Sequence, residues 1–111
     1  MLKSDRERLK KMILLWERLT AQIGEHQITK ESLMTDEFSQ WAVTTPLYNI
    51  GEQVYRISSD FKAAHPELPW AMVSGLRHRL VHDYEGINWS VIVEVVFDEM
   101  EPFISTVKTL I

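Results

Sequence analysis

The sequence predicts an all-α fold, an antiparallel bundle of four to five helices. Apolar residues recur every three or four positions along almost the whole chain, which is the period of an amphipathic helix. Very few stretches show the alternation of apolar and polar residues that a half-buried strand requires. The 111 residues contain no internal repeat, low-complexity segment or linker, so we expect a single domain over residues 1–111.

The first helix is expected to begin near Ser4 and to end at Gly24. Ser4 and Glu7 have the spacing of a capping box, in which each side chain satisfies a free backbone N–H of the first turn. Gly24 is a natural stop because glycine readily adopts the backbone conformation that closes many helices. The apolar stripe of this helix contains Leu9, Met12, Ile13, Trp16, Leu19 and Ile23. Residues 28–34 should then form a short helix or a turn.

A long second helix is expected to start near residues 35–37 and to continue to Ala64. Its apolar stripe contains Leu47, Ile50, Val54, Ile57, Phe61 and Ala64. Pro46 removes one backbone donor, so it either kinks one long helix or splits it, with Thr45 capping the second part. The kinked helix is favoured. Gly51 costs about 1 kcal/mol relative to alanine inside a helix, and a close approach by another backbone would explain its presence.

The break at residues 65–69 precedes a third helix, expected from about residue 70 to residue 81 or slightly further. A turn at residues 84–87 follows, and Asn88 is a good N-cap for a fourth helix. Its stripe contains Ile92, Val96, Met100, Phe103, Val107 and Leu110. Pro102 is expected to bend this last helix. Successive helices of such a bundle are expected to lie antiparallel.

Composition and charge exclude several classes of protein. The chain has no cysteine, so it can form neither disulfides nor thiolate metal sites. Its formal net charge of −4 argues against coating nucleic acid by bulk charge, although it permits a local basic site. The N-terminal residues lack the apolar core of a signal peptide, and no apolar run approaches the ~20 residues that a membrane span needs. We therefore expect a cytoplasmic protein with no membrane partner.

The run from Arg77 to Tyr84 is the most informative stretch for chemistry. It contains two arginines, two histidines, an aspartate and a tyrosine within eight residues. An arginine fork suits phosphate oxygens, and a histidine can give or take a proton near neutral pH. Basic residues near a helix C-terminus are also favoured by the helix dipole alone, at about 0.3–1 kcal/mol each, which is the competing interpretation.

Arg77 and His82 would not share one face of an ideal helix. Five residues at 100° each place them about 140° apart. They could meet if the helix ended near His82, so that the chain turned and the long Arg77 side chain reached back. Alternatively, two copies of the motif could face each other across a two-fold axis. The sequence leaves both arrangements open.

Arg77, His82 and Tyr84 match the pattern R-x4-H-x-Y, and in this the chain resembles the HEPN superfamily. The flanking residues also resemble its HepT-like toxin branch, and the resemblance extends over roughly residues 4–111. The flanking pieces are Ile50-Gly51-Glu52, Leu68-Pro69-Trp70, Arg79-Leu80-Val81-His82-Asp83-Tyr84 and Gly86-Ile87-Asn88-Trp89. One departure is His78, since the family often has a small polar residue, commonly asparagine, directly after the motif arginine.

The resemblance implies a HEPN-like helical bundle that forms a homodimer with its motifs facing each other. It also implies a metal-independent endoribonuclease without a cofactor, acting as the toxin of a toxin–antitoxin pair on tRNA or mRNA. Arg77 and His82 would be catalytic. The partner would be a minimal nucleotidyltransferase antitoxin that transfers AMP to Tyr84 and so silences the toxin.

Three further residues of the run, His78, Arg79 and Asp83, are candidates for RNA binding or an auxiliary role. His78 is equally well explained as helix-end polarity. A different class of function is also open at this point, namely a non-catalytic helical adaptor that binds a nucleotide or a nucleotidyltransferase partner. A purely structural helical dimer is the third interpretation, and it predicts no effect of replacing Arg77.

Overall fold

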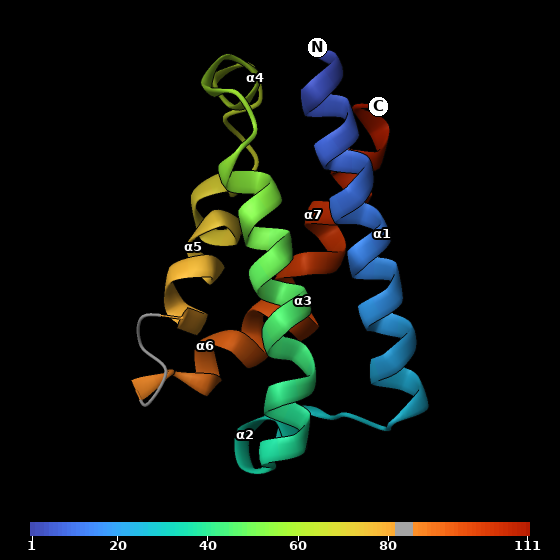
Figure 1. The fold of residues 1–111 in the computed structure, drawn as a ribbon, viewed down its shortest axis with the longest axis vertical. Coiled ribbons are helices and arrows are strands. Elements are labelled where there is room, and N and C mark those ends of the chain that lie inside the picture. The colour runs from blue at the N-terminus through green and yellow to red at the C-terminus, as the bar shows by residue number, and fades with distance from the viewer. Residues whose placement is uncertain (82–85) are drawn as a thin grey trace.

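The computed structural model describes residues 1–81 and 86–111, and within them every regular element is a helix. Three long helices and one segmented helix form the bundle, and two short helices lie in the connections. In chain order they are α1 (Lys3–Glu25), α2 (Lys30–Thr35), α3 (Glu37–Tyr55), α4 (Ser59–Ala64), α5 (Trp70–Val81), α6 (Trp89–Glu94), the π-helical η2 (Val95–Glu99) and α7 (Met100–Thr109). The long helices alternate in direction and bring both termini to one end (Figure 1), so the predicted antiparallel all-α bundle is confirmed.

The apolar stripes of the helices meet in one core. Val43, Leu47, Ile50 and Val54 on α3 are fully buried, as the helical period predicts. Each fully buried aliphatic side chain of this kind stabilises the fold by about 1.5–3 kcal/mol. The same core includes Leu9, Met12, Trp16 and Leu19 from α1, Val73, Leu76 and Leu80 from α5, and Ile92, Met100, Phe103, Ile104 and Val107 from the last segments.

The start of α1 differs from the predicted capping box. The helix begins at Lys3 after Leu2, which provides no side-chain cap, so Ser4 is already inside the first turn and cannot be the N-cap. The buried residue of this turn is Asp5, whose carboxylate accepts hydrogen bonds from the Ser58 backbone N–H at 2.9 Å and from the Ser58 hydroxyl at 2.6 Å. The first turn of α1 is therefore held by the loop before α4.

The long helix α3 runs without interruption through Pro46, so the split alternative is wrong. The expected continuation to Ala64 is also wrong, because α3 ends at Tyr55. Ser58 then caps α4, with its hydroxyl oxygen accepting from the Phe61 backbone N–H. Ile57 and Phe61 of the predicted stripe are still buried.

Helices α3 and α5 pack closely at Gly51. A Cβ atom placed on Gly51 would lie 3.0 Å from both the backbone nitrogen of Arg77 and the backbone oxygen of Val73. The close approach that the sequence could only suggest is thus confirmed, and it explains why glycine occupies a helix interior. This contact fixes Arg77 directly beside α3.

The third helix begins at Trp70 as predicted and is described as far as Val81, whereas the expected fourth helix is segmented. Asn88 is the N-cap residue of α6, but its side chain accepts from the Ser90 hydroxyl at 2.6 Å instead of capping the helix. Further along, the Met100 N–H donates to the carbonyl of Val95 five residues earlier, which is the π-helical spacing. None of the helices in residues 1–81 and 86–111 combines the length and apolarity that a bilayer crossing needs.

Candidate functional site at the end of α5

Arg77 is held on two sides by residues of α3. Its guanidinium carbon lies 3.6 Å from the centroid of the Tyr55 ring, a cation–π contact. Its Nη1 atom donates to Oε2 of Glu52 at 3.3 Å. The side chain remains 32% exposed, so donors of the guanidinium are still accessible to a ligand. Arg77 is therefore an oriented cation at the surface.

Glu52 binds a second arginine through its other oxygen. Oε1 accepts from Nε of Arg56 at 2.9 Å, one helical turn further along α3. The hydrogen bond from Arg56 is the main cause that lowers the pKa of Glu52 from its usual value of 4.5, and Arg77 lowers it further. Glu52 is thus a carboxylate shared by two guanidiniums, and it orients both.

Replacing this shared carboxylate gives a pH-dependent prediction for stability. Because folding lowers the pKa of Glu52, its stabilising effect is present above the unfolded pKa and is lost as pH falls through the folded pKa. Glu52→Gln should therefore lower the melting temperature by a few degrees at most near pH 7. The difference from wild type should shrink once the pH falls well below 4.5.

Thermal melts of wild type and variant across this pH range measure the effect. Glu17→Gln, which removes an exposed glutamate in the middle of α1, is the matched control and should show no such pH-dependent difference. An equal deficit of Glu52→Gln at neutral and acidic pH would contradict the assigned role of the charge.

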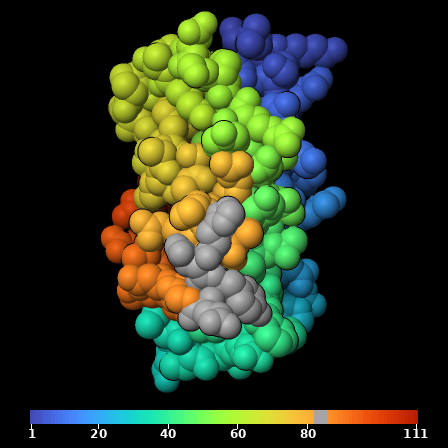
Figure 2. Space-filling model, turned by 60° about the vertical axis from the view of Figure 1, so that its left-hand side comes forward, coloured from blue at the N-terminus to red at the C-terminus, as the bar shows by residue number. Residues whose placement is uncertain are grey.

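A small hollow lies beside Arg77 at the end of α5. It has a volume of about 140 Å³ and is lined by Tyr48, Arg77, His78 and Val81. Arg79 is exposed on α5 and does not line it. The space-filling view in Figure 2 shows α5 at the surface, with α3 on one side and α6 on the other. The structure therefore brings together Arg77 and His78 of the predicted run, but not Arg79.

The other candidate residues, His82, Asp83 and Tyr84, lie outside the described residues. The described part of α5 extends to Val81. Which groups meet the His82 and Tyr84 side chains stays a prediction.

Sequence reasoning missed the α3 residues that surround Arg77. Tyr48, Glu52 and Tyr55 are spaced four and three residues apart, which places them on one face of α3. This polar and aromatic stripe beside the apolar one was visible in the sequence. What the sequence could not provide was the pairing of that face with Arg77, because this pairing depends on the packing of α3 against α5, which is closest at Gly51.

The fold and this site define a small helical-bundle protein with an oriented arginine at the surface. Comparison with known proteins gives the family. Residues 6–110 match the family described as "Ribonuclease HepT-like". The chain belongs to the HepT-like ribonuclease family, which confirms the resemblance seen in the motif residues.

Similar proteins carry ribonuclease names. A Thermococcus cleftensis protein named "Probable ribonuclease HepT" is 35% identical over 74 residues, covering 67% of this chain and 67% of that protein. A Methanocaldococcus jannaschii protein named "Putative RNase" is 31% identical over 86 residues, 78% of this chain and 71% of that one. A Caldanaerobacter subterraneus protein, also named "Putative RNase", is 30% identical over 84 residues, covering 76% of this chain and 75% of that protein. No solved structure gives a significant match.

Proposed function

We propose that this single-domain protein is a metal-independent endoribonuclease toxin that cleaves RNA with Arg77 and His82. The observation that carries the proposal is the oriented guanidinium of Arg77, five residues before His82 in a member of a ribonuclease family. An arginine fixed on two sides is preorganised to stabilise charge on a phosphoryl group, and this is often the largest catalytic term. The site would act in the cytoplasm on tRNA or mRNA.

The proposed reaction uses the ribose 2′-OH as nucleophile. A base takes the 2′-OH proton while the 2′-oxygen bonds to phosphorus, and an acid gives a proton to the 5′-oxygen as the P–O5′ bond breaks. His82 suits either task because an imidazole gains or loses a proton near neutral pH. Arg77 would bind the non-bridging oxygens, on which negative charge builds. The products are a 2′,3′-cyclic phosphate and a free 5′-hydroxyl.

A homodimer would supply the second proton carrier. Two copies of the motif across a two-fold axis would place a His82 on each side of the phosphodiester. The surface next to Arg77 supports this arrangement, because Tyr55 is 55% exposed and Val81 is 49% exposed. Burying these side chains against a second copy would remove apolar surface from water.

The proposed function predicts RNA cleavage that survives EDTA. Purified wild-type protein should cleave labelled RNA equally well with EDTA and with added Mg²⁺, because no step assigns a role to a metal. The 3′ ends should carry cyclic phosphates. A phosphatase that removes only open terminal phosphates should therefore release phosphate from these ends only after acid has opened the ring. Activity that disappears in EDTA and returns with Mg²⁺ would contradict the mechanism. No cleavage of any RNA, together with tight binding to a nucleotidyltransferase, would favour the adaptor function.

Modification of Tyr84 is the proposed means of neutralisation. A minimal nucleotidyltransferase would transfer AMP from ATP to the Tyr84 hydroxyl and release pyrophosphate. The added phosphate would repel the RNA backbone from a site built to bind phosphate. Incubation with the nucleotidyltransferase and ATP should therefore raise the mass of wild type by whole AMP groups and abolish cleavage. An equal mass gain on Tyr84→Phe would place the modification on another residue.

A further inference from the structure

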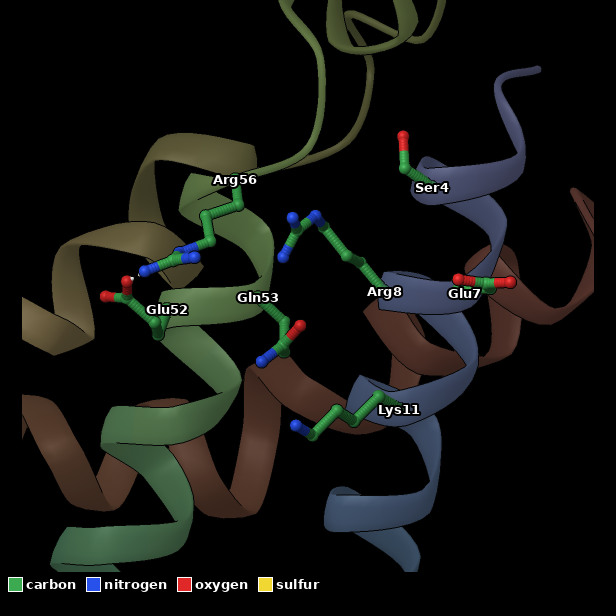
Figure 3. A pocket seen from close by; sticks show the side chains of 7 residues that line it. All are labelled: Ser4, Glu7, Arg8, Lys11, Glu52, Gln53 and Arg56. Atoms are coloured by element: carbon green, nitrogen blue, oxygen red, sulfur yellow. Dashed lines mark hydrogen bonds and ion pairs between the residues drawn. The ribbon is translucent and has the colours of Figure 1, made fainter.

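A second cationic surface lies between α1 and α3, next to the site at Arg77. It is an open groove of about 450 Å³. Figure 3 shows Arg8 and Lys11 extending from α1 toward α3, where Gln53 faces them. The residues that line the groove are Ser4, Glu7, Arg8, Lys11, Glu52, Gln53 and Arg56.

The cations of this groove are available to a ligand. Arg8 is half-buried and Lys11 is exposed, and neither forms an ion pair within the described part of the chain. Arg56 is paired with Glu52 through Nε, but its side chain is 56% exposed, so its terminal nitrogens remain accessible. Glu52 is already shared by two guanidiniums, which reduces its repulsion of an anion. Its lining has three cations, Arg8, Lys11 and Arg56, against two carboxylates, Glu7 and Glu52, so the groove is net positive in a chain of net charge −4.

The groove and the candidate site are joined by one side chain. Glu52 lines the groove, accepts from Arg56 through one oxygen and accepts from Arg77 through the other. The cationic surface therefore runs from Arg77 past Arg56 to Arg8 and Lys11. A chain of regularly spaced negative charges, with one of them at Arg77, fits this surface better than a single small anion does.

We propose that this groove binds the sugar–phosphate backbone of the RNA strand beyond the cleaved phosphodiester. This inference rests on the proposed function, because it takes the Arg77 site as the place of cleavage. Arg8 and Lys11 contact phosphates one or more nucleotides away, and Gln53 can donate to ribose or phosphate oxygens. Such contacts position the strand without reading its bases.

Arg8→Gln/Lys11→Gln is the decisive variant, since glutamine keeps part of the aliphatic stem and removes the charge. Arg56 is a poorer choice, because its loss would also disturb Glu52 and Arg77. Lys10→Gln/Lys108→Gln is the matched control, since it removes two exposed positive charges outside the groove. The probe is a 2′-O-methyl oligoribonucleotide of about 12 nucleotides, which cannot be cleaved because its 2′-oxygen is blocked.

The measurement is the dissociation constant as a function of salt concentration. Each phosphate contact contributes about 0.7 to the slope of log K against log[salt] for a single strand. Arg8→Gln/Lys11→Gln should flatten the slope by about 1.4, so between about 50 and 200 mM salt wild type should lose about sevenfold more affinity than the variant. The control pair should keep the wild-type slope, and thermal melts should show that all variants are folded.

Three results would overturn the groove. The first is that wild type does not bind the probe. The second is that Arg8→Gln/Lys11→Gln keeps the wild-type slope of log K against log[salt]. The third is that both double variants flatten this slope equally, which would indicate an effect of bulk charge. If the variant lost polyglutamate binding but kept RNA binding, the groove would suit an acidic protein segment instead. Cleavage of unmodified RNA by wild type is assayed in parallel. Its absence, with groove-dependent binding intact, would reject the proposed catalysis and leave the groove standing.

Discussion

Replacing His82 with alanine should lower the rate of RNA cleavage by about 10²–10⁴-fold, the usual contribution of a positioned general acid or base. Arg77→Ala should cost about 10²–10³-fold, because it removes the donor that meets charge on the phosphoryl oxygens. Arg77→Lys should recover only part of this loss, since an ammonium keeps the charge but lacks the planar fork that Glu52 and Tyr55 orient. Single-turnover cleavage of one labelled RNA measures all three.

Two control variants separate catalysis from general charge effects. Arg18→Ala and His26→Ala remove the same types of side chain from exposed positions in and after α1, and they should cleave like wild type. All variants should melt within a few degrees of wild type. Wild-type rates in folded His82→Ala would remove His82 from the mechanism. A loss in Arg18→Ala as large as that in Arg77→Ala would show that the effect is one of net charge.

Gly51→Ala should destabilise the fold although alanine is the better helix former. Alanine would gain about 1 kcal/mol in helix propensity, but its Cβ would lie 3.0 Å from two backbone atoms of α5. Backbone atoms cannot rotate away as a side chain can, so α5 must shift, and overpacking of this kind costs about 1–3 kcal/mol. We expect a net fall in melting temperature of up to about 5–10 °C. Because Arg77 lies at the contact, cleavage should fall as well.

Gly75→Ala is the matched control for this prediction. Gly75 also lies inside a helix, α5, but a Cβ atom there would meet nothing within 4 Å. The helix propensity gain of up to about 1 kcal/mol should therefore appear as higher stability. Chemical denaturation of the two variants and wild type measures both effects. If Gly51→Ala stabilised the fold as much as Gly75→Ala does, α3 and α5 would be able to move apart and fit the added methyl group without cost.

The helices could be predicted from the sequence wherever the spacing of apolar residues alone determines which segment is helical and which face is buried. The third helix begins at its predicted residue, and Leu47, Ile50 and Val54 of the predicted stripe of α3 are buried. The errors occurred where a tertiary contact outweighed a local signal. Ser4 and Glu7 have capping-box spacing, yet Asp5 turns inward to bind Ser58, and the helix starts before Ser4. The end of α3 at Tyr55 was hidden because the apolar stripe continues into α4.

Only part of the candidate site could be predicted from the sequence. The run from Arg77 to Tyr84 drew attention to Arg77 and His78, which line one hollow, because arginine and histidine suit phosphate chemistry. The catalytic roles of Arg77 and His82 stay predictions. Glu52 and Tyr55 could not be assigned to Arg77, because they lie more than twenty residues away and meet it only through packing of α3 against α5. The groove at Arg8 and Lys11 depends in the same way on the pairing of α1 with α3.

The central claim, that Arg77 and His82 act on the same phosphodiester, is tested most directly by an experimental structure with RNA bound. The protein would be crystallised with a 2′-O-methyl oligoribonucleotide, which fills the site without being cleaved. We expect one phosphate within hydrogen-bond distance, about 3 Å, of both the Arg77 guanidinium and a His82 imidazole from the same subunit or its partner. A strand whose phosphates bind elsewhere, with Arg77 and His82 on separate surfaces, would contradict the claim.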